Sequence, residues 1–222
     1  RGDQAAGNIR AKVSIRFGFL FSLSIDIYKF LRLYREKYWD IARMPSRQTD
    51  SLWTNPPVIL FHGTDSGSAA NIQRGGIDLG QCRKHTDFGC GFYTTTQESQ
   101  AWEWAENVVR RKNLHNGNNL AAAVLKFTVD RDNLAKLEGM AFILAGEDDS
   151  DYWTFVWHCR NFSDLHNRHG SNKQYQCVSG PVSLWPRYRI IAESDQFSFH
   201  DYESVAILGE PEILERDDIL EN

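Results

Sequence analysis

Short apolar segments bounded by glycine or proline alternate with helical patterns between residues 57 and 210, and this alternation restricts the fold more than any other feature. Three segments have the residues of strands: VILFH at 58–62, GFYTTT at 91–96 and AAAVLKFTVD at 121–130. Apolar residues at helical spacing occupy 68–77, 97–112 and 148–161. Because many strands are short and their order with helices is irregular, the pattern predicts an α+β fold with a mixed or antiparallel sheet.

The same pattern divides the chain into three parts. Residues 1–56 are expected to form a frayed terminus and an amphipathic helical segment from about 19 to 44, closed by two prolines. Residues 57–210 would form the main domain, and three further strands are expected within it, in YQCVSGPV (175–182), QFSFH (196–200) and VAIL (205–208). Residues 211–222 are expected to be an acidic tail.

Composition argues against several functional classes. The net charge of −4 is not that of a dedicated nucleic-acid binder. The four cysteines form no C-x-x-C pair, so we expect free thiols, no zinc site and no bound metal. The longest apolar stretch, residues 17–28, contains Asp26 and is too short to span a membrane. We expect an intracellular monomer, with secretion after removal of a leader left open.

Two glycine-containing strand ends carry the candidate chemistry, LFHGT at 60–64 and DFGCGFYTT at 87–95. His62, Gly63 and Thr64 place an imidazole, a backbone amide and a hydroxyl together, which suits a ligand with an amide and ribose hydroxyls. Tyr93 on the second strand and Trp104 on the following helix could enclose a flat heterocycle. For Trp104, a place in the core is the other reading of its helical spacing.

These motifs, in this order, resemble the ADP-ribosyltransferase fold over residues 57–208, in the branch that includes diphtheria toxin and the poly-ADP-ribose polymerases. That branch is marked by an H-Y-E triad, and the resemblance implies a split sheet flanked by helices. His62 and Tyr93 would be the first two members of the triad. The strand start expected to hold the glutamate has Gln196 instead. A less characterised branch of predicted transferases shares this H-Y-Q pattern, and Glu193 is a lesser candidate for the missing carboxylate.

The resemblance implies that NAD is the substrate and that no metal is needed. Gly63 and Thr64 would hold the nicotinamide carboxamide, His62 would bind ribose hydroxyls, and Tyr93 and Trp104 would pack around the nicotinamide ring. Gln196 could accept a hydrogen bond from the ribose 2′-hydroxyl but could not act as a general base. The sequence therefore predicts a mono-ADP-ribosyltransferase with catalytic residues His62, Tyr93 and Gln196.

Three other functions remain open at this point. An NAD glycohydrolase would use the same site with water as the acceptor, and a silent module would bind NAD or ADP-ribose without turnover. A phosphotransfer enzyme acting on the 2′-phosphate of RNA would be expected to carry more basic residues. The acceptor of the transferase is not defined, although a protein is favoured over a nucleic acid.

Overall fold

The computed structural model describes residues 54–117, 119–143, 149–162, 166–168 and 171–214. The amphipathic segment expected near 19–44 lies outside them. None of the helices in the described ranges is both long and apolar enough to cross a bilayer. The elements are β1 (Val58–Asp65), α2 (Ser66–Gly75), η1 (Leu79–Gln81), β2 (Phe92–Thr94), α3 (Glu98–Asn116), β3 (Ala122–Val129), α4 (Arg131–Leu134), β4 (Gly139–Ala141), α5 (Ser150–Asn161), β5 (Cys177–Ser183), β6 (Ile190–Phe199), α6 (Tyr202–Ala206) and β7 (Glu212–Leu214).

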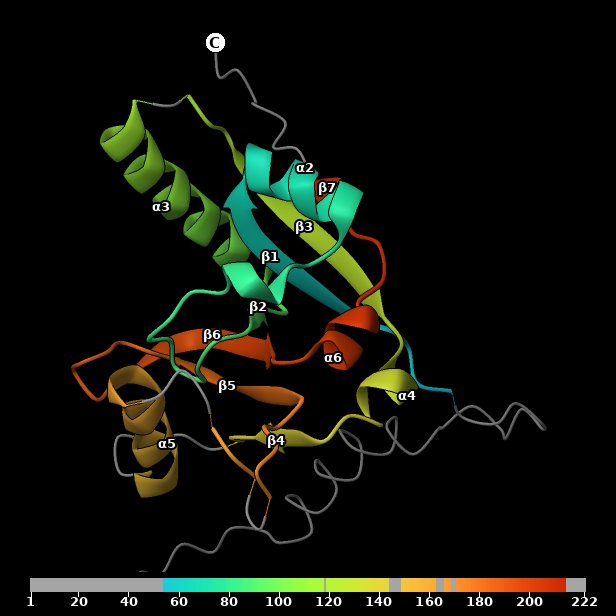
Figure 1. The fold of residues 1–222 in the computed structure, drawn as a ribbon, viewed down its shortest axis with the longest axis vertical. Coiled ribbons are helices and arrows are strands. Elements are labelled where there is room, and N and C mark those ends of the chain that lie inside the picture. Colours follow the sequence, from blue (N-terminus) through green and yellow to red (C-terminus); the bar gives the residue numbers. More distant parts are fainter. Residues whose placement is uncertain (1–53, 118, 144–148, 163–165, 169–170, 215–222) are drawn as a thin grey trace, which may run out of the picture. The chain divides into compact units, whose positions relative to one another are not determined.

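The first sheet is antiparallel, with the order β1-β3-β7, and helices cover both of its faces (Figure 1). Successive residues of β1 point to opposite faces, as in any strand. Leu60 packs with Ala69 of α2 in one buried cluster. Phe61 packs with Ala101 of α3 in another. Because adjacent apolar residues of β1 point to opposite faces of the sheet, α2 packs on one face and α3 on the other.

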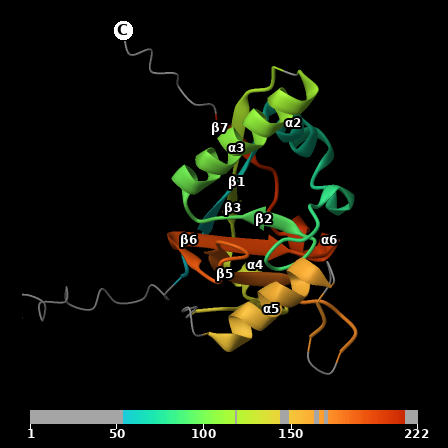
Figure 2. The same cartoon turned by 90° about the vertical axis from the view of Figure 1, so that its left-hand side faces the viewer.

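The second sheet has the order β2-β6-β5-β4 and is mixed, because β4 and β5 run parallel while the other pairs are antiparallel. Phe92 and Phe199 on one face share a core cluster with β1 and β3. The other face is covered by α5, whose Trp153 and Val156 are buried against Val178 (Figure 2). This arrangement of helices and mixed sheets confirms the predicted α+β class.

The two sheets are joined where β1 passes the end of β2. The backbone N–H of Phe61 donates to the carbonyl oxygen of Thr95 at 2.7 Å, and the N–H of Thr95 donates back to Phe61 at 2.9 Å. Asp195, within β6, accepts hydrogen bonds from the Thr95 hydroxyl at 2.5 Å and the Thr96 N–H at 2.9 Å. These contacts attach the end of β2 to β1 and to β6.

Three expectations are corrected. VAIL at 205–208 is not a strand: the Asp201 side chain caps α6 by accepting from the N–H of Ser204, and this local bond outweighs the apolar composition. Residues 212–214, expected in the acidic tail, form β7 because Ile213 and Leu214 pair with β3. Cys82 and Cys90 form a disulfide, against the expectation of free thiols, because their loop brings the Cα atoms to 5.5 Å; the other two cysteines are buried and are not in a disulfide.

Candidate functional site

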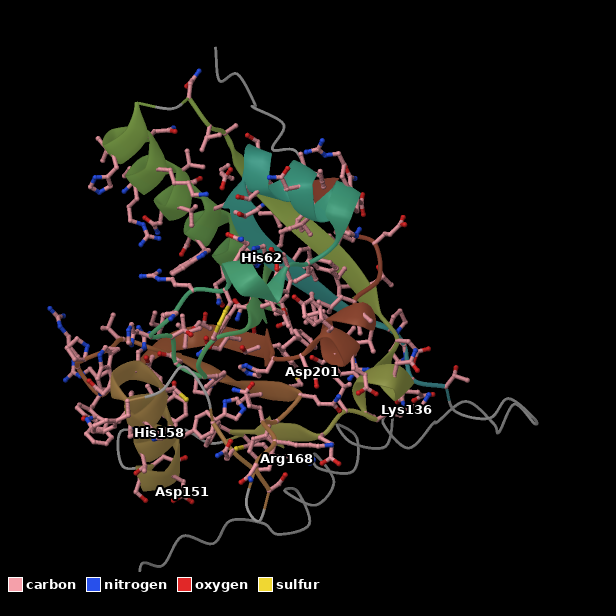
Figure 3. The ribbon with its side chains drawn as sticks, viewed as in Figure 1. His62, Lys136, Asp151, His158, Arg168 and Asp201 are labelled. Carbon is pink, nitrogen blue, oxygen red and sulfur yellow. A yellow bond between two sulfur atoms is a disulfide. The ribbon has the colours of Figure 1, made fainter. Side chains whose placement is uncertain are left out.

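His62 lies on β1 close to β2 and is held in one tautomer (Figure 3). Its Nδ1 is 2.6 Å from the carbonyl oxygen of Tyr93, which can only accept, so the proton is on Nδ1. Burial lowers the pKa of His62 and outweighs the opposing effect of this hydrogen bond. The ring stacks on Phe92 with centroids 4.3 Å apart. At neutral pH His62 is therefore an oriented, uncharged imidazole whose Nε2 is a hydrogen-bond acceptor.

Gly63 presents its backbone polar groups at the edge of β1 that faces away from β3. In an antiparallel pair, alternate residues direct both N–H and C=O to the same side. Phe61 directs both groups to Thr95, and the register with β3 is regular, so Gly63, two residues later, directs its own to the same side. Among the described residues, no backbone group pairs with them there. A backbone donor and a backbone acceptor, both at a buried glycine, thus lie next to His62.

Gly63 is also required by packing. A Cβ at this position would lie 1.9 Å from the carbonyl oxygen of Ala101, so α3 passes directly over the strand. Thr64, the next residue, is buried and shares the face of β1 that His62 occupies. The run His62-Gly63-Thr64 therefore occupies the place where β1, β2 and α3 meet.

Tyr93 points to the opposite face of β2 from Phe92, toward the aromatic cluster under α5. Its hydroxyl accepts from the Phe88 N–H at 2.9 Å and lies 2.8 Å from the carbonyl oxygen of Gly89. Burial raises its pKa far above the ordinary value, so the phenol is neutral. Tyr93 thereby fixes the turn formed by residues 86–89, the start of the DFG run.

Gln196 is buried inside β6 and not, as the sequence predicted, at a strand start, because β6 already begins at Ile190, which pairs with Ser183 of β5. Both of its amide hydrogens are used. Nε2 donates to Asp87 Oδ2 at 2.8 Å and to the carbonyl oxygen of Pro181 at 2.9 Å. Both partners are acceptors, so the orientation of the amide is fixed by chemistry. The carbonyl oxygen of Gln196 is the part of the side chain left to accept a hydrogen bond.

Asp87 is the centre of this network, and the sequence did not identify it as a site residue. It is only 2% exposed. One carboxylate oxygen accepts from Arg160 Nε at 2.8 Å and Nη2 at 2.5 Å, and from the Ser183 hydroxyl at 2.5 Å. The other accepts from the Ser183 N–H at 2.8 Å as well as from Gln196. The position of Asp87 at the head of the DFGCGFYTT motif was the available signal for this role.

Hydrogen bonds therefore link three of the predicted residues. His62 contacts the backbone of Tyr93, Tyr93 fixes the turn that contains Asp87, and Asp87 holds Gln196. Glu193, the lesser candidate, is exposed, and its described polar contact is through its backbone carbonyl, which accepts from the Gln97 side chain. It is not part of this network.

Trp104 is found neither in the core nor in contact with Tyr93, the two positions that the sequence suggested. Its side chain is 48% exposed, so it is not a core residue, although Ala101 and Ala105 on the same helix are buried. The ring contacts that the described residues give it are the guanidinium groups of Arg83 and Arg111, and they do not include Tyr93. The expected enclosure of a heterocycle by Tyr93 and Trp104 is therefore not formed in this structure.

Two further observations concern clusters of metal-ligating side chains and surface hollows. Within the described ranges, no group of three or more His, Cys, Asp or Glu side chains could hold a metal ion. A surface hollow on α3, lined by Glu98, Ser99, Trp102, Glu103 and Glu106, contains none of the linked residues. The candidate site is thus the junction of β1, β2 and β6 and not this acidic hollow.

Comparison with known proteins gives a family without an assigned activity. No curated protein matches the chain. A family model described as a protein of unknown function, DUF3990, matches residues 58–193. The matched range is more than half of the 222 residues, contains His62, Asp87 and Tyr93, and ends three residues before Gln196. The chain belongs to the DUF3990 family.

Proposed function

We propose that this protein is an NAD-dependent mono-ADP-ribosyltransferase that cleaves the nicotinamide–ribose bond and transfers ADP-ribose to a macromolecular acceptor. The observation that carries the proposal is the backbone donor and acceptor of Gly63 beside a neutral His62. A carboxamide can donate to a backbone carbonyl oxygen and accept from a backbone N–H of the same residue. The imidazole Nε2 can accept from a ribose hydroxyl.

Gln196 would act on the transition state through its carbonyl oxygen. As the bond from C1′ to nicotinamide breaks, the ribose gains positive charge, and nicotinamide leaves as a neutral molecule with the bonding electrons. A hydrogen bond from the ribose 2′-hydroxyl to a fixed acceptor stabilises that charge. Because both amide hydrogens of Gln196 are bound by Asp87 and Pro181, the acceptor needs no reorganisation during the reaction.

The same amide limits the choice of acceptor. Gln196 has no basic lone pair at neutral pH and cannot remove a proton from a sugar hydroxyl. Elongation to a polymer would need that step, so single transfer is favoured. The acceptor would have to be nucleophilic already, would form the new bond to C1′, and would release its proton to solvent. No metal takes part in this scheme.

Release of nicotinamide from NAD by the whole chain tests the proposal. We expect His62→Ala and Gln196→Ala to lower the rate at least about tenfold, which corresponds to roughly 1.4 kcal/mol of barrier. His115→Ala and Gln81→Ala, at exposed positions, are matched controls and should leave it unchanged. Transfer of labelled ADP-ribose to protein would distinguish a transferase from a glycohydrolase. Binding of NAD without release would indicate a silent module, and absence of binding would overturn the proposal.

A further inference from the structure

Two arginines that are distant in sequence converge on the exposed indole of Trp104. Arg83, in the loop after η1, has its guanidinium carbon 5.9 Å from the ring centroid. Arg111, two turns along α3 from Trp104, has its guanidinium carbon 5.6 Å away. Both arginines are exposed. A guanidinium over an indole is attracted by the ring quadrupole, so Trp104 holds both cations at one place on the surface.

Among the described residues, no carboxylate lies within salt-bridge distance of either arginine. The polar contact of Arg111 is with the carbonyl oxygen of Asn107, at 3.2 Å. The nearby Arg160 forms an ion pair with buried Asp87, so its charge is balanced there. Partial burial, followed by repulsion from Arg111 and Arg160, lowers the pKa of Arg83. Two cations held together without an anion favour an anionic ligand between them.

The loop that carries Arg83 is tied to the candidate site. Cys82, its neighbour, is bonded to Cys90, with the Cα atoms 5.5 Å apart, and Cys90 lies three residues before Tyr93. On the other side, Trp104 is next to Ala105, whose backbone packs over Gly63. A disulfide thus connects the loop of Arg83 to the segment that precedes Tyr93, and the helix that carries Arg111 packs over Gly63.

We propose that Arg83 and Arg111, oriented by Trp104, bind the diphosphate group of a nucleotide. Guanidinium groups present paired N–H donors that match phosphate oxygens, and two of them can hold the adjacent phosphates of one diphosphate. This inference rests on the proposed function for the identity of the nucleotide, NAD. It assigns to Trp104 the positioning of two cations in place of stacking on the nicotinamide ring.

Calorimetric titration of the whole chain with ADP, inorganic pyrophosphate and nicotinamide mononucleotide, at about 0.15 M salt, tests the proposal. ADP and pyrophosphate carry the diphosphate, and the mononucleotide does not. We expect Arg83→Gln and Arg111→Gln each to weaken ADP binding at least tenfold and to change mononucleotide binding less than twofold. Arg110→Gln removes the same charge from the neighbouring exposed position on α3 and should change ADP binding less than twofold.

The outcomes separate this proposal from the proposed function. If ADP binds through the two arginines but NAD is not cleaved, the phosphate site stands and the transferase proposal fails. Failure of the parent to bind ADP or pyrophosphate would overturn the phosphate site, as would equal losses in all three arginine variants. A single-stranded oligonucleotide that binds through the same arginines while ADP does not would also overturn it. Unfolding midpoints equal to that of the parent would show that the variants are folded.

Discussion

Replacement of Gln196 by glutamate tests whether the glutamine is required by its surroundings. The change would restore the H-Y-E pattern, but it would remove both donors from a position with two acceptors. A glutamate oxygen would lie near Asp87 Oδ2 and the carbonyl oxygen of Pro181, which now accept from Nε2 at 2.8 and 2.9 Å. The structure therefore predicts that Gln196→Glu destabilises the fold and does not increase NAD cleavage.

The loss of stability is set by the cheaper of two alternatives: the introduced glutamate stays charged and is repelled by Asp87, or it takes up a proton. Two carboxylates 2.8 Å apart repel by about 6 kcal/mol at an effective dielectric constant of about 20. Keeping a glutamic acid of ordinary pKa protonated costs less, about 4 kcal/mol at pH 7 and about 1 kcal/mol at pH 5. One hydrogen bond, worth about 1 kcal/mol, is lost as well. We expect a loss of about 3–5 kcal/mol at pH 7 and about 2 kcal/mol at pH 5, because the pKa of this carboxyl would be raised.

Urea unfolding of the parent, Gln196→Glu and Gln196→Ala at pH 5 and pH 7 measures this directly. The alanine variant loses the same two hydrogen bonds but introduces no charge, so its loss should be the same at both pH values. Adding Asp87→Asn to the glutamate variant should recover only part of the loss. The new amide can donate to the glutamate but then opposes the N–H of Ser183. A glutamate variant as stable as the parent at pH 7, or equally destabilised at both, would refute the reasoning.

Three further outcomes are expected in urea unfolding of the whole chain. Gly63→Ala should lower the free energy of unfolding by about 3 kcal/mol or more, because its Cβ would overlap the backbone of α3. Gly75→Ala, whose Cβ meets no atom within 4 Å, should change it little, and equal effects would contradict the packing argument. Burial lowers the pKa of His166 and of His200 to about 4, so stability should fall by up to about 3 kcal/mol per histidine as the pH drops from 6.5 to 4; a flat profile would exclude this. Burial raises the pKa of Asp65, but hydrogen bonds from a lysine and a serine outweigh it and lower the pKa to about 2. The charged Asp65 therefore stabilises the fold by about 1 kcal/mol, a small value because solvent screens the 43% exposed lysine. This stabilisation should be lost between pH 4 and pH 2, and Asp65→Asn should remove it.

The fold class followed from the sequence because local patterns and packing agree over most of the main domain. The strand AAAVLKFTVD became β3, and the helical pattern after GFYTTT became α3. The wrong predictions concern segments whose structure is determined by a few side-chain contacts. VAIL has strand composition, but the Asp201 cap makes it helical. The disulfide depends on two cysteines eight residues apart whose loop brings their Cα atoms to 5.5 Å, which spacing alone does not reveal.

The candidate site was predicted only in part, for a physical reason. Motifs identify residues within short strand-like segments, so His62, Tyr93 and Gln196 could be named from the sequence, although all three lie inside their strands and not at the ends. The partners of Gln196 are Asp87 of the DFG turn and Pro181 of β5, and Asp87 is itself bound by Arg160 of α5; only the folded chain brings these residues together. The exposure of Trp104 was not predicted, because helical spacing does not distinguish an apolar contact from a surface cation–π contact.

The network around Asp87 changes what the glutamine at position 196 implies. A substitution of the catalytic glutamate in an otherwise unaltered pocket would be a loss, but here a buried carboxylate and a carbonyl oxygen demand a donor. A neutral amide stabilises the developing charge on ribose less than a carboxylate does. Under the proposed function, more of the lowering of the barrier must then come from contacts remote from C1′. Arg83 and Arg111 are placed to supply such contacts at the diphosphate, so the two proposals together explain how an H-Y-Q site could turn over NAD.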